Sequence, residues 1–452
     1  MMGYIINYTY FIYAFYNHVN NYSPKNVEYL KKCTKRCGAM AIKLLQFIQM
    51  FDPQLLKDFN YVFEENCVHD FEYTFDTYHK EYSRNIFDDY RFDYTTEVVY
   101  KDFNVVGSGS IGQVYKAFCK KRNEYVAIKV KHPNINKVVK KTVIAINFVC
   151  FICKYFNKFH YVMMEFVKNI KLQIDYHQEA KNTITLKEKF KEESRLIVPE
   201  VYSYSDSFII MSYHSGKSYS DVSPDLQLLT SVYLQFIHLT SCIIHNFIHV
   251  DLHIGNWKIH EENNDIKIII YDCGLMFSSN DINTNVKLIE AVYNRKNIIN
   301  LLDIVEVKDC KNKRLFKKYV DGLLEIEELS ASNFFRKFIL KGIDLGLLKD
   351  TNILNILISV VILGDISRKS CEIFTKYLRS NSTSNTNLFH SYIGFFERCG
   401  YFNQLKQHFI NELTPVDAQI YSDWLFDQFG HRKGDILNNI IYSKIYKAFL
   451  TV

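Results

Sequence analysis

The chain has 452 residues, which is enough for two or three domains that together bury a sizeable core. Hydrophobic residues make up 48% of it and charged residues 23%, as in an ordinary globular protein. The formal net charge of +6 is small for this length and spread along the chain, so we expect no nucleic-acid partner. No stretch reaches the roughly 20 apolar residues that cross a bilayer.

The eleven cysteines are irregularly spaced. Two close pairs occur, Cys33 with Cys37 and Cys150 with Cys153, and neither is completed by the second His or Cys pair of a zinc site. We therefore expect buried or free thiols in a reducing compartment such as the cytoplasm.

Residues 1–95 are predicted to be helical. The aromatic segment Tyr4–Tyr16 lacks the basic start of a signal peptide, and a helix that contacts a membrane surface is an alternative for it. Apolar residues recur at helical spacing over Val27–Met50, where Asp52-Pro53 then breaks the pattern. A further helix is expected over Gln54–Cys67.

The hydrophobic period changes from about 3.6 to about 2 near residue 98. Val98–Val106, Gln113–Phe118 and Tyr125–Val130 are predicted as three successive strands. Two more strands are expected at Ile197–Tyr202 and Ser207–Tyr213. Helices are expected between the two groups, from residue 136 to residue 190.

A Gly-x-Gly-x-x-Gly-x-Val motif joins the first two predicted strands. Its glycines would let the backbone approach phosphate oxygens. The third strand carries Val-Ala-Ile-Lys, which places the ammonium group of Lys129 within reach of α- and β-phosphates. A hairpin at this point, in place of a strand-turn-helix, argues against a dinucleotide-binding unit. The expected nucleotide-binding residues of the motif are Gly107, Ser108, Gly109, Ser110, Ile111, Gly112, Gln113 and Val114.

Lys129 lies on an otherwise apolar strand, so it needs a carboxylate partner. Glu179 is our choice, although sequence spacing leaves Glu165 and Glu192 open. The segment that follows the last predicted strand could link two lobes and offer backbone groups to an adenine, at Met211 and Tyr213.

Beyond residue 216 the chain is expected to be mostly helical. A long apolar helix over Leu226–Phe247 leads into the loop His249–Asn256. In this loop Asp251 can accept a proton from an attacking hydroxyl, and Asn256 can hold a divalent cation. Asp272 follows an apolar strand and precedes Cys273-Gly274, so it could supply a second oxygen ligand to Mg²⁺.

In chain order, a glycine-rich hairpin, Val-Ala-Ile-Lys, a Glu-bearing helix, His-x-Asp-x-x-x-x-Asn and Asp-x-Gly form the protein-kinase-like set. The finer pattern resembles the atypical aarF-domain kinases, or UbiB family, which are linked to ubiquinone biosynthesis. The segments that carry this resemblance are Ser110–Val114, Lys129–Pro133, Glu179–Asn182 and Asp251–Asn256. It covers roughly residues 38–300.

The resemblance implies that the N-terminal helical extension carries a Lys-x-Gly-Gln motif and folds over the active site. Lys43 and Gln46 match that motif, with Leu45 in place of its Gly. The family's Glu-x-Asp is represented by Gln173 and Asp175. These departures put the family's self-occluded, weakly transferring behaviour in doubt for this chain.

We therefore expect an α+β, two-lobed protein-kinase-like fold with a helical extension at residues 1–95, an N-lobe at 96–216 and a C-lobe at 217–452. ATP with Mg²⁺ would bind between the lobes and undergo phosphoryl transfer or hydrolysis, with an acceptor that the sequence does not name and a link to quinone or lipid metabolism. The alternatives are a small-molecule phosphotransferase of the aminoglycoside or choline kinase type, an ATPase acting near membrane lipids, and a non-catalytic nucleotide-binding module.

Overall fold

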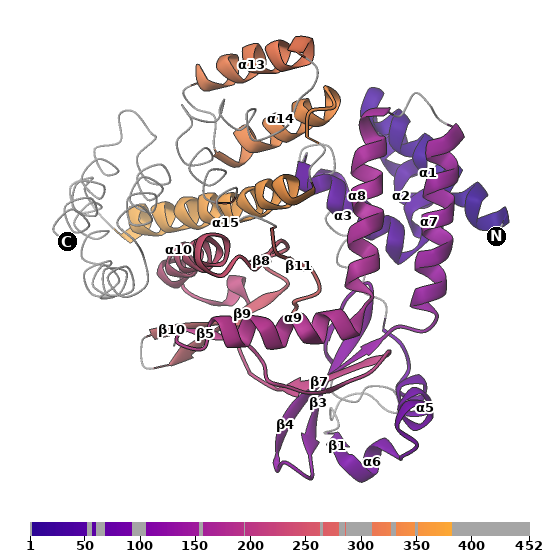
Figure 1. Ribbon diagram of the computed structural model, residues 1–452, viewed down its shortest axis with the longest axis vertical. Helices are drawn as coiled ribbons and strands as arrows, with labels where there is room; N and C mark the ends of the chain where they lie inside the picture. The colour runs from indigo at the N-terminus through magenta and orange to yellow at the C-terminus, as the bar shows by residue number, and fades with distance from the viewer. Residues whose placement is uncertain are drawn as a thin grey trace. The chain divides into compact units, whose positions relative to one another are not determined.

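The computed structural model describes two compact units, which we call unit 1 and unit 2. Unit 1 comprises Met1–Glu193, Ile197–Ser215 and Ile270–Leu275, and unit 2 comprises Ser194–Leu196, Gly216–Ile269 and Met276–Val452. The structure describes residues 2–51, 57–59, 68–92, 105–152, 157–193, 195–262, 265–279, 285, 310–326, 331–348 and 351–381 (Figure 1). Helices and sheets are both present, which confirms the α+β class and the N-terminal helices.

The N-terminal part of unit 1 is a group of packed helices (Figure 1). Its members are α1 (Met2–Asn20), α2 (Pro24–Cys37), α3 (Ala39–Phe51), α7 (Ile135–Ile152) and α8 (Asn157–Gln173). Helix α1 packs on α2 and α7, and α3 packs on α7 and α8. The inward face of α1 buries Tyr8, Phe11 and Phe15, and the Tyr8 hydroxyl lies 3.2 Å from that of Thr142 on α7.

Gly38 divides the helix that the sequence predicted over Val27–Met50. Its φ of 76° lies in the left-handed region, which favours glycine, and its N–H donates to the Thr34 carbonyl, so α2 ends there and α3 begins at the next residue. The single predicted helix is therefore wrong. Within the expected helix Gln54–Cys67, the structure describes only a 3₁₀ turn at Lys57–Phe59, and the rest lies outside the described residues.

The sheet of unit 1 is antiparallel, in the order β1-β3-β4-β7-β6, and β2 also pairs with β3. Its strands are β1 (Tyr90–Phe92), β2 (Val105–Ser108), β3 (Gly112–Cys119), β4 (Glu124–Lys131), β6 (Val201–Tyr204) and β7 (Phe208–Ser212). The hairpin of β3 and β4 and the strand β7 confirm the predictions for those segments. Residues 93–104, which include most of the first predicted strand, lie outside the described part of the chain.

Side chains alternate between the two faces of this sheet, and each face has its own cover. Ile128 and Phe208 face Tyr78 on α5 (Phe71–Tyr82), which is followed by α6 (Ile86–Asp89). Ile209 and Met211 face the other way and pack on Tyr176 at the start of α9 (Tyr176–Lys189). The period of two therefore sends Lys129, next to Ile128, toward α9.

Two strands correct the sequence prediction in unit 1 and at its border. Tyr90–Phe92 was expected to be helical but forms β1, because its register along β3 buries Tyr90 and Phe92 and leaves Arg91 exposed. The single strand expected over Ile197–Tyr202 is interrupted at Val198–Glu200, which includes a proline. Its first residue belongs to β5 (Leu196–Ile197), which pairs with β10, whereas β6 pairs with β7.

The described residues of unit 2 form helices and two small sheets. Helix α10 (Pro224–Thr240) continues as a short π-helix, η4 (Ser241–His245), and packs on α15 (Thr351–Asn381). Helix α15 also packs on α14 (Ala331–Asp344), and α14 contacts α13 (Cys310–Leu324). Strand β8 (Ile248–His249) pairs with β11 (Met276–Phe277). The prediction that this part is mostly helical missed β9 (Trp257–Glu262), which pairs with β10 (Asp265–Ile270).

Helix α1 presents aromatic residues on its outer face as well. The side chains of Tyr10, Tyr13 and Tyr16 are about half exposed. No helix among the described residues is long and apolar enough to cross a bilayer. Contact of this helix with a membrane surface stays a prediction. Cys33 and Cys37 are buried free thiols, as expected.

Candidate active site

A lysine and two carboxylates meet inside unit 1. Lys129 on β4 donates to Glu179 Oε1 at 2.5 Å and to Asp272 Oδ2 at 3.2 Å. Glu179 lies on the face of α9 that also buries Tyr176 and Ala180, so the helix aims it at the sheet. The ion pair between Lys129 and Glu179 is the one that the sequence predicted. Glu165 is buried on α8 with one carboxylate oxygen lacking a hydrogen bond, and Glu192 is exposed.

The charges of this group are strongly coupled. Burial lowers the pKa of Lys129, but Asp272 and Glu179 outweigh it and hold that pKa well above the usual value. Burial raises the pKa of Glu179 to about 7 against the opposing effect of Lys129. Burial would also raise the pKa of Asp272, but Lys129, the Gly274 N–H and Lys43 lower it well below its usual range. Asp272 therefore stays ionised, as a ligand of Mg²⁺ must.

Asp272 is held in place through both of its oxygens. Oδ2 accepts from Lys129, and Oδ1 accepts from the backbone N–H of Gly274 at 3.0 Å. The next carbonyl, that of Cys273, accepts from Asn182 on α9 at 2.9 Å. The Asp272 side chain is 36% exposed, so a cation can still reach its oxygens. The donor set thus fits a phosphate-bound Mg²⁺ next to Lys129.

The glycine-rich segment forms the turn between β2 and β3. The Gly109 N–H donates to the Gly112 carbonyl at 2.9 Å, and Val114 lies opposite Lys129 in the β3–β4 register. A Cβ on Gly112 would lie 2.4 Å from both the Tyr176 hydroxyl and the Val130 carbonyl, so no larger residue fits there. The turn therefore lies beside the lysine strand.

The other predicted nucleotide-binding residues of unit 1 differ in how available they are. Ser108 and Ser110 are partly exposed at the turn, and Ile111 packs with Tyr176. Gln113 is fully buried, and its amide is bonded to the backbone of His69, away from solvent.

Met211 and Tyr213 lie at the end of β7. Met211 is buried and pairs with Ala127, whereas the Tyr213 N–H donates to the Tyr125 carbonyl at 3.2 Å. That N–H is therefore already occupied by protein, and adenine binding at this segment stays a prediction.

The loop with Asp251 and Asn256 lies in unit 2 and is organised by its own backbone. The Asp251 N–H donates to His249 Nδ1 at 3.2 Å, and its carbonyl accepts from the Asn256 side chain at 2.7 Å. The indole of Trp257, which is 1% exposed, donates to the Leu252 carbonyl and anchors the end of the loop. The Asp251 carboxylate is 18% exposed and lies 3.7 Å from His253 Nε2.

The extension brings its lysine close to Asp272. Lys43 and Gln46 are both half-buried on α3, and the charge of Lys43 helps to lower the Asp272 pKa. Gln173, the last residue of α8, lies against Gly274, 3.7 Å from where a Cβ on it would be. The three elements α3, α8 and the Asp272 segment therefore lie close together within unit 1.

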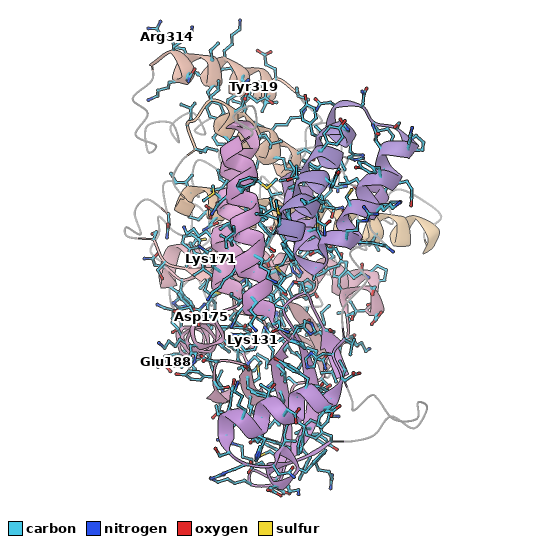
Figure 2. The ribbon with its side chains drawn as sticks, turned by 90° about the vertical axis from the view of Figure 1, so that its right-hand side faces the viewer. Lys131, Lys171, Asp175, Glu188, Arg314 and Tyr319 are labelled. Atoms are coloured by element: carbon cyan, nitrogen blue, oxygen red, sulfur yellow. The ribbon has the colours of Figure 1, made fainter. Side chains whose placement is uncertain are left out.

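Asp175 has a structural role that the sequence did not predict. Its side chain caps α9 by accepting from the Gln178 N–H at 3.0 Å. It lies near Lys131 at the end of β4 (Figure 2), where burial lowers the Lys131 pKa and the charges of Asp206 and Asp175 oppose that shift. Asp175 thus orients the helix that carries Glu179.

His69 and His132 are residues of this region that the sequence analysis missed. The two rings hydrogen-bond to each other, and His132 also donates to the Gly109 carbonyl of the glycine-rich turn. The sequence signal for His132 is its place in the Lys129–Pro133 segment, directly after the lysine strand, whereas nothing in the sequence relates it to His69.

A strand lysine paired with a helix glutamate, an Asp-Cys-Gly turn beside them and, elsewhere in the chain, an Asp…Asn loop are features of the protein-kinase-like class. Residues 76–300 match the ABC1 atypical kinase-like domain. The resemblance to aarF and UbiB kinases is thereby confirmed.

Two curated relatives are similar to part of the chain. The chain is 30% identical over 193 residues to "AarF domain-containing kinase 1" of Drosophila melanogaster, which covers 39% of this chain and 36% of the relative. It is 30% identical over 201 residues to "Probable protein kinase UbiB" of Blochmanniella pennsylvanica, which covers 41% of this chain and 37% of the relative. The matched part is therefore a little over one third of each relative.

A solved complex of Rv3197 with erythromycin from Mycobacterium tuberculosis aligns with 73% of this chain and 90% of its own. The TM-score is 0.42 and the identity 15%.

Proposed function

We propose that the chain binds Mg·ATP and transfers or hydrolyses its γ-phosphate. The observation that carries this proposal is the position of Lys129, 2.5 Å from Glu179 and 3.2 Å from Asp272. An ammonium group oriented by a buried carboxylate is suited to α- and β-phosphates, and the neighbouring Asp272 is suited to their Mg²⁺. The glycine-rich turn at residues 107–112 would cover the phosphates.

The loop of unit 2 would supply the remaining groups. Asp251 would orient or deprotonate the attacking hydroxyl or water, and Asn256 would hold Mg²⁺ together with Asp272. The order of the motifs along the chain supports these roles. The match of residues 76–300 to the ABC1 atypical kinase-like domain supports an atypical kinase or ATPase over a small-molecule phosphotransferase of the aminoglycoside or choline kinase type. A link to quinone or lipid metabolism rests on the resemblance to the UbiB family.

A thermal-shift experiment tests nucleotide binding. Mg·ATP at about 100 times its dissociation constant should stabilise the folded protein by roughly 2.7 kcal/mol and raise its melting temperature. Asp272→Asn should remove the Mg²⁺-dependent part of the shift. Asp206→Asn is the matched control, since Asp206 is an exposed aspartate of unit 1 that contacts His177. Equal Mg·ATP shifts for wild type and Asp272→Asn would contradict the assignment.

The departures in the extension predict a second result. Leu45 takes the place of the Gly of the family motif and is fully buried. Gln173 takes the place of the family's Glu and lies against Gly274. Together these should hold the extension on the site less firmly, because the added side chain prevents a close approach and a negative charge near Lys43 is missing. Leu45→Gly combined with Gln173→Glu should therefore lower ATP turnover, and so, separately, should Gly109→Ala in the nucleotide turn.

Turnover of each variant is to be compared with that of wild type and of the exposed control Asp206→Asn. If the extension variant and the Gly109 variant both turn over ATP at or above the wild-type rate, the proposal that the extension is held less firmly on the site is refuted. This holds even if α3 still packs beside Asp272.

A further inference from the structure

A chain of hydrogen bonds connects the segment before α5 to the glycine-rich turn. His132 Nε2 lies 2.8 Å from the Gly109 carbonyl oxygen, and His132 Nδ1 lies 2.8 Å from His69 Nδ1. On its other side, His69 Nε2 lies 3.0 Å from the Thr74 hydroxyl, which lies 3.0 Å from the Tyr115 hydroxyl. The chain therefore runs from the turn, through two imidazole rings, to α5 and β3.

The direction of every proton in this chain follows from its end at Gly109. A carbonyl only accepts, so His132 carries its hydrogen on Nε2, and in the neutral ring Nδ1 is then an acceptor. His69 must therefore donate from Nδ1, which leaves its Nε2 to accept from the Thr74 hydroxyl. The Thr74 oxygen in turn accepts from Tyr115. Two neutral histidines of opposite tautomer satisfy the whole chain.

The backbone of His69 is fixed independently of its ring. Gln113 accepts from the His69 N–H at 2.9 Å and donates to its carbonyl at 3.0 Å, as a paired strand would. The same Gln113 amide donates to the Tyr115 hydroxyl. Because Gln113 is fully buried, its two hydrogen bonds to the His69 backbone are sheltered from water. The His69 ring can therefore be replaced without releasing the segment that carries it.

The surroundings favour the neutral form of both rings. Burial and the proximity of His132 lower the pKa of His69 to about 4, although Asp70 opposes the shift. Burial also lowers the pKa of His132, against the effect of the Gly109 carbonyl. The other titratable side chains facing His69 are Tyr73 and Tyr115. A second proton on His132, at Nδ1, would place its N–H face to face with the Nδ1–H of His69.

We propose that His69 and His132 are positioning residues that hold the Gly109 carbonyl, and with it the glycine-rich turn, in the conformation that receives the nucleotide phosphates. Lys129 and the Gly-rich turn lie on the same hairpin, so a fixed turn places the phosphates against the lysine. The phosphate part of this inference rests on the proposed function. The positioning of the turn does not.

Four variants test the proposal. His69→Leu and His132→Leu each break the chain, and His69→Asn keeps one N–H that can still donate to His132 Nδ1. His79→Leu is the control, since His79 is an exposed histidine on α5 that bonds to the Arg84 carbonyl. Hydrogen exchange of residues 105–112 without nucleotide, and the Mg·ATP dissociation constant, are measured for each at pH 7.5.

Each Leu variant should raise exchange in residues 105–112 and the dissociation constant about fivefold, which corresponds to the loss of one hydrogen bond. His69→Asn should restore most of both, and His79→Leu should change neither. Unchanged exchange in both Leu variants, or His69→Asn as impaired as His69→Leu, would overturn the proposal. A wild type that binds no Mg·ATP would refute the proposed function, while the exchange data would still decide the positioning.

Nitrogen-15 spectra of the wild-type histidines give a readout that needs no variant. At pH 7.5 we expect neutral His132 protonated on Nε2 and neutral His69 protonated on Nδ1. The opposite tautomers, or a charged ring at this pH, would contradict the chain even if a variant failed to fold.

Discussion

Replacing Asp251 with Asn is expected to lower ATP turnover by about 10²–10⁴-fold, the usual contribution of a general base. Mg·ATP binding should persist, because the variant keeps every group of unit 1 that is proposed to hold the phosphates. The loop should keep its conformation as well. It is held by the Asp251 N–H, which bonds to His249, and by the Asp251 carbonyl, which bonds to Asn256, so the carboxylate is not needed for its shape.

The matched control is Asp221→Asn, at an exposed aspartate of unit 2 that contacts Ser220. Turnover should be measured with and without lipid vesicles or candidate protein acceptors, since the acceptor is open. Wild type that binds Mg·ATP and turns it over no faster than Asp251→Asn would reduce the function to nucleotide binding. A loss of Mg·ATP binding in Asp251→Asn would show that Asp251 contributes to binding the nucleotide and not only to the chemical step.

Replacing Lys129 with Met should lower the unfolding free energy more than any of the other single substitutions does. Glu179 is 2% exposed, so removing its cation leaves a buried carboxylate beside Asp272. Breaking a buried ion pair in this way costs about 3–5 kcal/mol of unfolding free energy. Urea unfolding of the variant, with an unchanged slope against denaturant, measures it.

The pH dependence of this loss has a definite sign. The folded-state pKa of Glu179 is about 7, above its ordinary value of 4.5, and without Lys129 it should rise further. A carboxyl that holds its proton more tightly in the folded state contributes stability below the unfolded pKa, and this is lost as pH rises through the folded pKa. Lys129→Met should therefore lose more stability relative to wild type at pH 8 than at pH 6.

A double variant distinguishes charge from packing. Lys129→Met with Glu179→Gln removes both charges of the pair, and it should recover most of the stability that Lys129→Met loses. Lys187→Met is the control on α9, since Lys187 forms an exposed pair with Glu200 at 3.2 Å and should cost no more than about 1 kcal/mol. A loss in Lys129→Met as small as that of the control would show that the lysine is dispensable for the fold.

Local pattern was sufficient for several parts of the fold. The period of two over Gln113–Phe118 and Tyr125–Val130 predicted β3 and β4 to within two residues, because alternation marks a sheet with two covered faces. It failed at Tyr90–Phe92, a three-residue strand too short to show a period. Helical periodicity failed at Gly38, where the apolar pattern continues past a glycine that ends the helix.

The sequence by itself determined which side chains are candidates for the site. Lys129, Asp251, Asn256 and Asp272 stand in motifs whose order and spacing are local properties, and an ammonium group on an apolar strand requires a carboxylate wherever it comes from. Only the tertiary structure decided which carboxylate pairs with Lys129. Glu165, Glu179 and Glu192 differ in the direction in which local packing points their side chains. The same holds for His69 and His132. They are 63 residues apart, and their hydrogen bond to the glycine-rich turn exists only because folding brings the start of α5 beside β3, which no local pattern encodes.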